Sequence, residues 1–352
     1  MRFTKPGKKF VTEFLKLANK AKTICITAHL SPDEDSVAAM LAVYHFLTVK
    51  YPKKKIKIIQ TGEKVDKYNI FANFDKVQFV RDLIDHLAGV DLLIMLDGCE
   101  FSRFTYQAEK LKSFKIKTIC IDHHSSQPDN FNLSLIIPNY SSCIEIIYLS
   151  FFKKQKINKA LAEIFMLGIL GDTGCFKYLK PDQLKTLEIA KKLIKIADIE
   201  IQEFLARYET IPKKVFKIVS ELIKNTKYHQ IKNWPDFQVS FIERGFAKEN
   251  NLGNNEVSEA SHIYMSHYLR LVKGYPWGFV LTPKVNGDYS ISFRSLPQSV
   301  NVRNLMERMR LGGGHNRAAG GGFKMKNNKP RQVPECLKKI LNWMKHHKPV
   351  LE

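Results

Sequence analysis

Side chains that could bind a metal ion stand directly after three apolar runs in the first half of the chain. The runs cover residues 23–28, 92–96 and 117–121, and they are followed by His29, by Asp97 and by Asp122-His123-His124, respectively. Uninterrupted apolar runs of this length are typical of buried strands in parallel sheets. In open α/β sheets, ligands bind in the crevice at the carboxyl ends of the strands. The three strand ends therefore predict one pocket that contains both carboxylates and imidazoles.

Further carboxylates belong to the same prediction. Asp33 and Asp35 lie shortly after His29, and Asp172 follows an apolar segment in the run Gly168-Ile-Leu-Gly-Asp172-Thr-Gly. Together with Asp97, these carboxylates would repel one another and raise each other's pKa if no counter-ion were present. Two divalent cations would neutralise that charge, and mixed oxygen and imidazole ligands favour Mn²⁺ over Mg²⁺. We therefore expect a site for two divalent metal ions, with Mn²⁺ preferred.

Each of these residues also has an ordinary structural explanation. His29 could be a hydrogen-bonded loop residue, and Asp33 could cap the helix that follows it. Asp97 and Asp172 each stand beside residues that are typical of turns. The coincidence of such residues at several strand ends favours the metal site over these separate explanations.

The order of the predicted elements indicates an α/β fold in the first half of the chain. We expect helices at 8–21, 36–50, 142–153 and 158–171, and strands at 23–28, 56–60, 91–97 and 117–122. Alternating strands and helices predict a parallel sheet with helices on both faces. Helices expected at 182–195 and 200–225, rich in Lys, Leu and Ile at helical spacing, are predicted to lead into a connector.

From about residue 230 the pattern changes to the alternation of half-buried strands, seen at 237–242 and 289–294. Helices are expected near 255–270, 301–310 and 333–346. This second domain is predicted to be smaller and of mixed α/β type. The expected division is a metal-binding domain at 1–195, a helical connector at 196–229 and a substrate-binding domain at 230–352.

The composition fits a two-domain globular protein with acidic partners. The 352 residues exceed a typical single domain, and 44% of them are hydrophobic. Lys and Arg number 56 against 34 Asp and Glu, a formal net charge of +22, which favours phosphates or nucleic acid; lysines on solvated faces would give the same excess. The six cysteines lack metal-binding spacing and are expected to be reduced core residues of a cytoplasmic protein.

The sequence predicts neither a signal segment nor a membrane span.

In these motifs the chain resembles the DHH phosphoesterases, a family named for the tripeptide that stands here as Asp122-His123-His124. The segment 29–36 resembles the first family motif, Leu96-Asp97 with Arg103 downstream resembles the second, and 168–174 resembles the fourth. The resemblance implies that one metal ion is held by His29, Asp33 and Asp97, and the other by Asp35, Asp97, His123 and Asp172. Asp97 would bridge the two ions. Asp122 would orient its neighbouring histidines, and His124 would face the scissile phosphate as a catalytic residue.

Two departures from the family pattern stand in the first motif. Glu34 lies between the two aspartates, where the family usually has glycine, and Ala38-Ala39 replace the Gly-Ser that commonly follows. Glu34 could add a carboxylate to the site or point to solvent. The departures concern metal affinity and metal choice more than the class of reaction.

A glycine-rich segment, Gly312 to Gly322 with His315 near its middle, is the second strong motif. Accessible backbone amides in such a segment suit a phosphate, although a mobile linker has a similar composition. The segment resembles the phosphate-binding loop of the DHH-associated domain, and residues 292–295 resemble the strand that faces it. Arg294 shares the polar face of its strand, where it would either form an exposed salt bridge or grip a substrate phosphate. The expected substrate-binding residues are Arg294, Ser295, Gly313, Gly314 and His315.

The resemblance implies an active site in the cleft between the two domains and hydrolysis at phosphorus by in-line displacement, with a water shared by both ions as the nucleophile. His124 would donate a hydrogen bond to a non-bridging oxygen as negative charge builds up there. Arg294 and His315 would hold a phosphate that does not react and would thereby limit the length of the substrate.

Within the family, the chain is most similar to the bacterial nano-RNases that also act as 3′-phosphoadenosine-5′-phosphate (pAp) phosphatases. The resemblance implies a phosphodiesterase that degrades very short RNA, such as pApA, to mononucleotides and that also removes a phosphate from pAp. A cyclic di-AMP phosphodiesterase of the same family is the alternative, and a non-catalytic nucleic-acid-binding protein is an alternative of another class. The expected partners are short oligoribonucleotides or dinucleotides and pAp, with no membrane, and the sequence leaves a homodimer open.

Overall fold

The computed structural model describes residues 1–30 and 32–352; Ser31, within the first motif, lies outside the described residues. The chain forms two compact units, Met1–Thr210 and Ile211–Glu352, and their boundary falls within the predicted connector at 196–229. The single helix predicted at 200–225 is wrong, because this stretch forms two helices, α7 (Ile201–Ala206) and α8 (Lys213–Lys224). Pro212 is the N-cap residue of α8, and a residue that precedes proline is disfavoured in a helix, so the helical pattern breaks there.

The first unit is built on a seven-stranded parallel sheet, which confirms the predicted α/β fold. Its strands are β1 (Arg2–Phe3), β2 (Thr23–Ala28), β3 (Lys55–Thr61), β4 (Val77–Val80), β5 (Leu92–Leu96), β6 (Lys117–Asp122) and β7 (Leu133–Ile136). They are arranged in the order β1-β7-β6-β5-β2-β3-β4. Strands β1, β4 and β7 were not predicted, because strands of two to four residues are too short to show a pattern.

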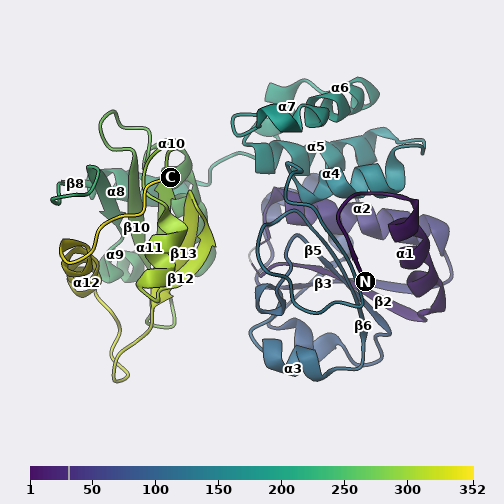
Figure 1. The fold of residues 1–352 in the computed structure, drawn as a ribbon, viewed down its shortest axis with the longest axis horizontal. Coiled ribbons are helices and arrows are strands. Elements are labelled where there is room, and N and C mark those ends of the chain that lie inside the picture. Colours follow the sequence, from purple (N-terminus) through teal and green to yellow (C-terminus); the bar gives the residue numbers. More distant parts are fainter. Residues whose placement is uncertain (31) are drawn as a thin grey trace. The chain divides into compact units, whose positions relative to one another are not determined.

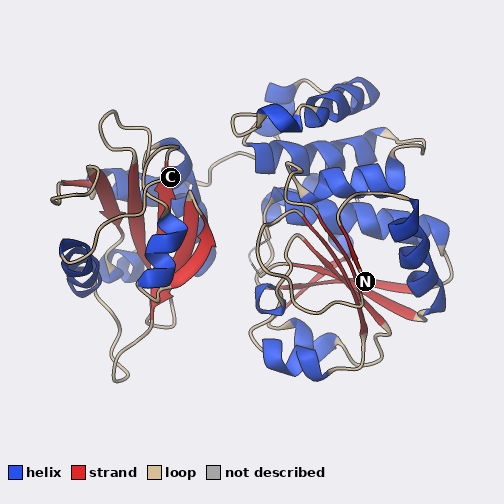
Figure 2. Ribbon diagram, viewed as in Figure 1, coloured by secondary structure: helices blue, strands red, loops and turns tan. Residues whose placement is uncertain are grey.

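Helices lie on both sides of this sheet, as Figures 1 and 2 show. The helices are α1 (Lys8–Lys20), α2 (Glu34–Lys50), α3 (Ala108–Ser113), α4 (Cys143–Ile147), α5 (Lys159–Thr173) and α6 (Lys185–Ala197). One face of the sheet is covered by α1, α2 and α4, with α5 packed on α2 and α6 packed on α5. The other face is covered by α3 and by short 3₁₀ helices such as Leu83–His86. Because α5 lies between two other helices, it is apolar on almost every side.

The strand order of the sheet reverses between β2 and β5. From β2 the chain adds β3 and then β4 on one side, whereas β5, β6 and β7 lie on the other side. A reversal of this kind opens a crevice at the carboxyl ends of the strands on either side of it. The register sets Ala28 of β2 beside Leu96 of β5, and Leu96 beside Ile121 of β6. The residues that follow these three strands therefore leave the sheet side by side.

The second unit contains a six-stranded mixed sheet in the order β12-β13-β11-β10-β9-β8. Its strands are β8 (Lys227–His229), β9 (Phe237–Phe241), β10 (Trp277–Pro283), β11 (Tyr289–Ser295), β12 (Gly312–His315) and β13 (Ala318–Phe323). Its helices are α8, α9 (Arg244–Glu249), α10 (Asn254–His267), α11 (Val302–Arg308) and α12 (Val333–Lys345). One face of the sheet packs against α11 and α12, while α8 and α10 cover the region of β10 around Val280 on the opposite face. Strand β10 was not predicted, because it is buried along its whole length and so shows no alternation of apolar and polar residues.

The glycine-rich segment is a β-hairpin, which corrects the expectation of a loop. Strands β12 and β13 pair in antiparallel fashion, with His315 opposite Ala318 and Gly313 opposite Gly320, and β13 also pairs with β11. Glycines on the face towards α11 allow a close approach, since a Cβ on Gly321 would overlap the backbone of Leu311 and lie 2.8 Å from Met306 Cε.

Within the described residues, no helix has both the length and the apolar character needed to cross a membrane.

Candidate metal centre

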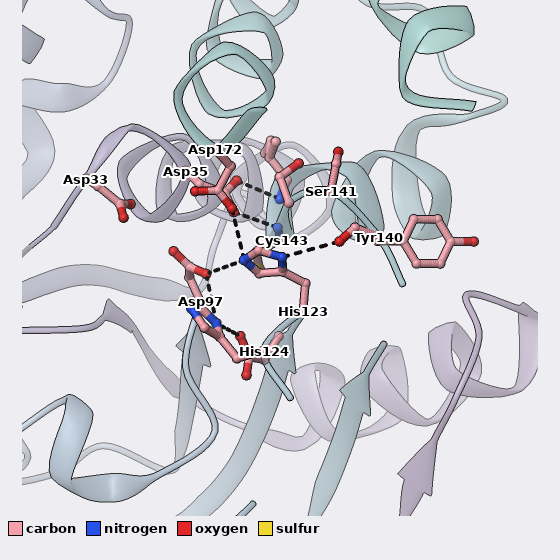
Figure 3. Close-up of polar contacts among 12 residues, drawn as sticks. Asp33, Asp35, Asp97, His123, His124, Tyr140, Ser141, Cys143 and Asp172 are labelled. Carbon is pink, nitrogen blue, oxygen red and sulfur yellow. Dashed lines mark hydrogen bonds and ion pairs between the residues drawn. The ribbon is translucent and has the colours of Figure 1, made fainter. Parts of the chain in front are cut away.

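The predicted metal ligands come together at the carboxyl edge of the first unit's sheet. Three groups of side chains have ligand atoms that lie within 4.8 Å of one another: His29 with Asp33 and Asp97, Asp35 with His123 and Asp172, and Asp97 with His123 and His124. All the ligands expected from the sequence belong to these groups. Figure 3 shows part of the cluster, with Asp97 and His123 near its middle and Asp35 and Asp172 on the adjoining helices.

Asp97 joins the two halves of the cluster. Its Oδ2 lies 3.4 Å from His29 Nε2, and its Oδ1 lies 3.4 Å from His123 Nε2. The residue is 1% exposed, and Oδ1 is buried without a hydrogen-bond partner. Its backbone is left-handed, with a φ of 59°, a conformation that costs a non-glycine residue about 1–3 kcal/mol. A buried carboxylate with an unsatisfied oxygen, held by an unfavourable backbone, fits a ligand that bridges two cations.

The second group is centred on His123. Its Nε2 lies 2.9 Å from Asp172 Oδ2, and its Nδ1 lies 3.4 Å from the carbonyl oxygen of Tyr140. That carbonyl accepts a hydrogen bond when the proton is on Nδ1, which leaves Nε2 to act as a ligand. The contact of Tyr140 could not be predicted from the sequence, because it is made by a backbone carbonyl, which every residue has.

The contacts of Asp33 fit both explanations that the sequence allowed, the helix cap and the metal ligand. Its Oδ1 accepts a hydrogen bond from Ser36 N at 3.0 Å and so caps α2, and the Ser36 hydroxyl accepts one from Asp33 N. Its Oδ2 lies 3.5 Å from His29 Nε2. The capping contact therefore leaves the other oxygen towards the candidate metal site.

Asp35 is fixed by a different part of the chain. It is fully buried, and its carboxylate accepts hydrogen bonds from Cys143 N and Ile144 N at the start of α4, at 2.5 and 2.9 Å. These contacts are among those drawn in Figure 3. This contact could not be predicted, because the partners are backbone amides more than a hundred residues away along the chain.

The glycines that precede Asp172 allow α5 to approach α2 and α4 closely. A Cβ on Gly168 would lie 2.7 Å from Ile144 Cγ2 and 2.9 Å from Asp35 Oδ1. A Cβ on Gly171 would overlap the Cβ of Glu34. Only residues without a side chain fit at these two positions, which places Asp172, in the last turn of α5, against the metal-ligand segment of α2.

Asp122 contacts His124, which belongs to the third of these groups. His124 Nδ1 lies 2.7 Å from Asp122 Oδ1 and 3.6 Å from Asp97 Oδ1. Asp122 is fully buried as the last residue of β6. This contact is what an orienting carboxylate requires, and it directs the opposite edge of the His124 ring away from Asp122.

A further buried residue positions His29. Gln60 Nε2 donates to His29 O at 2.7 Å, and Gln60 Oε1 accepts from Ala28 N at 3.3 Å, so one carboxamide holds the backbone on both sides of this bend. Gln60 is fully buried near the end of β3. The sequence signal for this role is a glutamine that directly follows Ile58-Ile59 in the strand predicted at 56–60.

The crowded carboxylates and the burial of the cluster shift the pKa values of its members. Burial alone would lower the pKa of His29, but the neighbouring Asp33 and Asp97 carboxylates raise it to about 10. The pKa of His123 is likewise raised well above its usual value, because Asp172 and Asp97 outweigh burial. Burial, with the charges of Asp172 and Asp97, raises the pKa of Asp35 well above its usual range. In the protein alone, protonated imidazoles supply positive charge where divalent cations would supply more.

The residues present fit a two-cation centre. Oxygen and imidazole ligands converge, Asp97 has an unsatisfied buried oxygen, and the histidines have carboxylate or carbonyl partners. Such a donor set suits transition metals such as Mn²⁺ or Zn²⁺ and leaves the choice among them to geometry and availability.

In the second unit, the expected substrate-binding residues do not all share one face. Arg294 of β11 and His315 of β12 are both opposite Ala318 of β13, so all three residues project from the same face of the sheet. Gly313 lies on this face as well, through its pairing with Gly320. Ser295 and Gly314 lie on the opposite, core-facing side, and Ser295 is fully buried.

Comparison with known proteins identifies the two units. The model of the DHH family N-terminal domain matches residues 23–169, and the model of the DHHA1 domain matches residues 246–346. The chain therefore carries a DHH domain followed by a DHHA1 domain.

Two relatives are named as bifunctional oligoribonuclease and PAP phosphatase. The chain is 27% identical to a probable bifunctional oligoribonuclease and PAP phosphatase NrnA of Streptococcus mutans, over 88% of this chain and 93% of the relative. It is 26% identical to the bifunctional oligoribonuclease and PAP phosphatase NrnA of Bacillus subtilis, over 89% of this chain and 93% of the relative.

Solved structures of similar fold cover almost the whole chain. An exopolyphosphatase-related protein from Bacteroides fragilis matches with a TM-score of 0.77 at 20% identity over 97% of each chain. RecJ from Thermus thermophilus in complex with Mn²⁺ matches with a TM-score of 0.53 at 12% identity, over 97% of this chain and 55% of RecJ. At these identities the likeness concerns the fold alone.

Proposed function

We propose that this protein is a Mn²⁺-dependent phosphodiesterase that hydrolyses very short RNA, such as pApA, to mononucleotides and that also dephosphorylates pAp. The observation that carries the proposal is the chain of contacts through the buried Asp97, whose Oδ2 lies 3.4 Å from His29 Nε2 and whose Oδ1 lies 3.4 Å from His123 Nε2. His123 Nε2 in turn lies 2.9 Å from Asp172 Oδ2. Two bound divalent ions would supply an activated water and neutralise charge at the reacting phosphate. The names of relatives that align over most of their length support the substrate class.

In this proposal the residues of the first unit have distinct tasks. His29 and Asp33 would hold one ion, Asp35, His123 and Asp172 would hold the other, and Asp97 would bridge them. His124, which is oriented by Asp122 at 2.7 Å, would donate a hydrogen bond to a non-bridging phosphate oxygen. Tyr140, Cys143 and Gln60 would act through the ligands that they position.

The second unit would bind the part of the substrate that does not react. Arg294 and His315 project from a face of β11, β12 and β13 that carries small residues between them. A Cβ on Gly313 would meet no atom within 4 Å, and one on Gly320 would make only ordinary contacts. Packing therefore does not require glycine at these two positions, whereas an approaching phosphate or nucleoside would need the space. This supports Arg294, Gly313 and His315 as substrate-binding residues.

The test compares substrates and metals directly. The protein is incubated with pApA, five-nucleotide RNA, pAp and cyclic di-AMP, each with Mn²⁺ or with a chelator, and the products are separated by chromatography. We expect Mn²⁺-dependent release of mononucleotides from the short RNAs and of phosphate from pAp. Preferential turnover of cyclic di-AMP would favour the alternative phosphodiesterase, and no turnover of any substrate would leave only a binding function.

Asp97→Asn tests the bridging carboxylate. Removing its charge should reduce kcat on pApA by at least about a hundredfold, the scale on which loss of a single electrostatic contact to a transition state acts. The variant should keep the wild-type circular dichroism spectrum. A near wild-type kcat would refute the assigned bridge.

A further inference from the structure

Glu34 forms an ion pair with Lys67 beside the candidate metal centre. Glu34 Oε1 lies 2.6 Å from Lys67 Nζ, and the two side chains are 21% and 30% exposed, respectively. Among the described residues, Glu34 belongs to none of the three metal-ligand groups. The structure thus differs from both arrangements expected from the sequence, because Glu34 is neither in a ligand group nor directed simply to solvent.

The pair is held in place by packing. The Cβ of Glu34 occupies the space that a side chain at Gly171 would need, one residue before Asp172. Lys67 belongs to the 3₁₀ helix Asp66–Ile70, and its ammonium group lies 4.9 Å from the ring centroid of the buried Tyr68. Burial raises the pKa of the Tyr68 hydroxyl, and the adjacent Glu34 carboxylate raises it further. These contacts define one position for both charges.

The sequence position of Glu34 makes its charge relevant to the metal ions. It lies between Asp33 and Asp35, which both belong to the ligand groups, and it contacts α5 next to Asp172. An uncompensated carboxylate here would add to the negative potential of the site and attract divalent cations more strongly. An uncompensated ammonium group would do the reverse. With both present and 2.6 Å apart, the two contributions largely cancel.

We propose that Glu34 and Lys67 form a charge-compensating pair in which each charge offsets the effect of the other on the divalent-metal affinity of the centre, with Glu34 acting through its electrostatic field and not as a ligand. The inference rests on the proposed metal centre. It also accounts for the replacement of glycine at this position, because the added carboxylate comes with its own counter-charge.

A cycle of charge-removing variants tests the pair. The dissociation constant of Mn²⁺ is measured by isothermal titration calorimetry and by the electron paramagnetic resonance signal of free Mn²⁺, without substrate, for the wild type, Lys67→Met, Glu34→Gln and the double variant. We expect Lys67→Met to bind Mn²⁺ roughly three- to tenfold more tightly and Glu34→Gln to bind it more weakly by a similar factor, as expected for one charge near the site at intermediate dielectric. The double variant should lie within about twofold of the wild type, because it again has no net charge at the pair.

Two controls separate charge from general disturbance. Lys214→Met removes a lysine of similar exposure that pairs with Glu256 at 2.8 Å in the second unit, and it should leave Mn²⁺ affinity unchanged. Lys67→Arg keeps the positive charge and should stay close to wild type; Lys67→Gln replaces Lys67→Met if the latter does not fold.

The outcomes distinguish this inference from the metal centre on which it rests. Shifts of the same sign in both single variants would overturn it. A loss of more than about a hundredfold in Glu34→Gln, with no change in Lys67→Met, would also overturn it and would identify Glu34 as a ligand. If the wild type bound no Mn²⁺, both the metal centre and this inference would be refuted. If the wild type bound Mn²⁺ but the dissociation constants of Lys67→Met and Glu34→Gln did not shift in opposite directions, only the inference would be refuted.

Discussion

The carboxylate of Asp35 accepts a hydrogen bond from the backbone amide of Cys143, which is the first residue of α4, at 2.5 Å. The neighbouring amide of Ile144 is bonded to the other carboxylate oxygen at 2.9 Å. A candidate ligand on α2 is thus oriented by a separate helix, and both of its oxygens are held before any cation binds. The geometry of this part of the site consequently depends on how α2, α4 and α5 pack together.

Gly168→Ala tests this dependence. The new methyl group would lie 2.7 Å from Ile144 Cγ2 and 2.9 Å from Asp35 Oδ1, so α5 must shift or Asp35 must leave the amides of α4. Overpacking of this kind costs about 1–3 kcal/mol, and we expect a lower Tm together with weaker Mn²⁺ binding. Differential scanning fluorimetry and calorimetry measure the two effects. Gly245→Ala, where a Cβ meets nothing within 4 Å, is the matched control and should change neither.

Much of the candidate site could be predicted, because several of its residues directly follow strands of the sheet. His29, Asp97 and His123 directly follow neighbouring parallel strands, and the position of a residue relative to its own strand is visible in the sequence. The register of β2, β5 and β6 then places these residues together without any further information. Asp172 could be recognised because the glycines that precede it are visible in the sequence. In the structure these glycines permit close packing of the helices.

What could not be predicted depends on contacts between distant backbone segments. Tyr140 and Cys143 contribute a carbonyl and an amide, which every residue possesses, so residue type carries no information about their roles. The hairpin of β12 and β13 was read as a loop, because glycine is depleted in strands and its presence conceals strand pairing. The Glu34–Lys67 pair joins two segments that no local pattern connects.

Binding of metal ions should release protons at neutral pH. The pKa of His29 is raised to about 10 and that of His123 well above its usual value, so both imidazoles carry a proton at pH 7 in the metal-free protein. An imidazole must be neutral to act as a ligand, so Mn²⁺ displaces these protons. Calorimetric titration with Mn²⁺ at pH 7 in PIPES and in Tris should give heats that differ in proportion to the ionisation enthalpies of the buffers. Equal heats in both buffers would contradict the assignment of these histidines as ligands.

The same shifts determine how the metal-free protein responds to pH. Because the pKa of folded His29 is higher than its ordinary value of 6.5, its contribution to stability is complete below about pH 6.5 and is lost as the pH rises towards 10. The Tm of the chelator-treated protein should therefore fall over this interval. Saturating Mn²⁺ should reverse the trend, since metal affinity increases as the imidazoles lose their protons.

Arg294→Ala tests the substrate contact of the second unit. Loss of a charged contact to a phosphate that does not react should raise KM for pApA about tenfold or more and change kcat little. Initial rates measured over a range of pApA concentrations separate the two constants. Arg303→Ala, which removes an exposed arginine paired with Glu307 at 2.8 Å, is the matched control and should leave KM unchanged. An Arg294→Ala variant with a wild-type KM would place the phosphate contact elsewhere.

Gly313→Val tests whether the glycines beside Arg294 provide space for the substrate. A Cβ at Gly313 meets no atom within 4 Å, and valine is favoured in strands, so the variant should fold with a Tm equal to or above that of the wild type. If the substrate lies on this face, the added side chain should raise KM for pApA while Mn²⁺ affinity stays unchanged. Gly321→Ala gives the contrasting case, because a Cβ there would overlap the backbone of Leu311 and should lower the Tm. A Gly313→Val variant with unchanged KM would show that the substrate does not contact this part of β12, and the absence of a side chain at Gly313 would then need another cause.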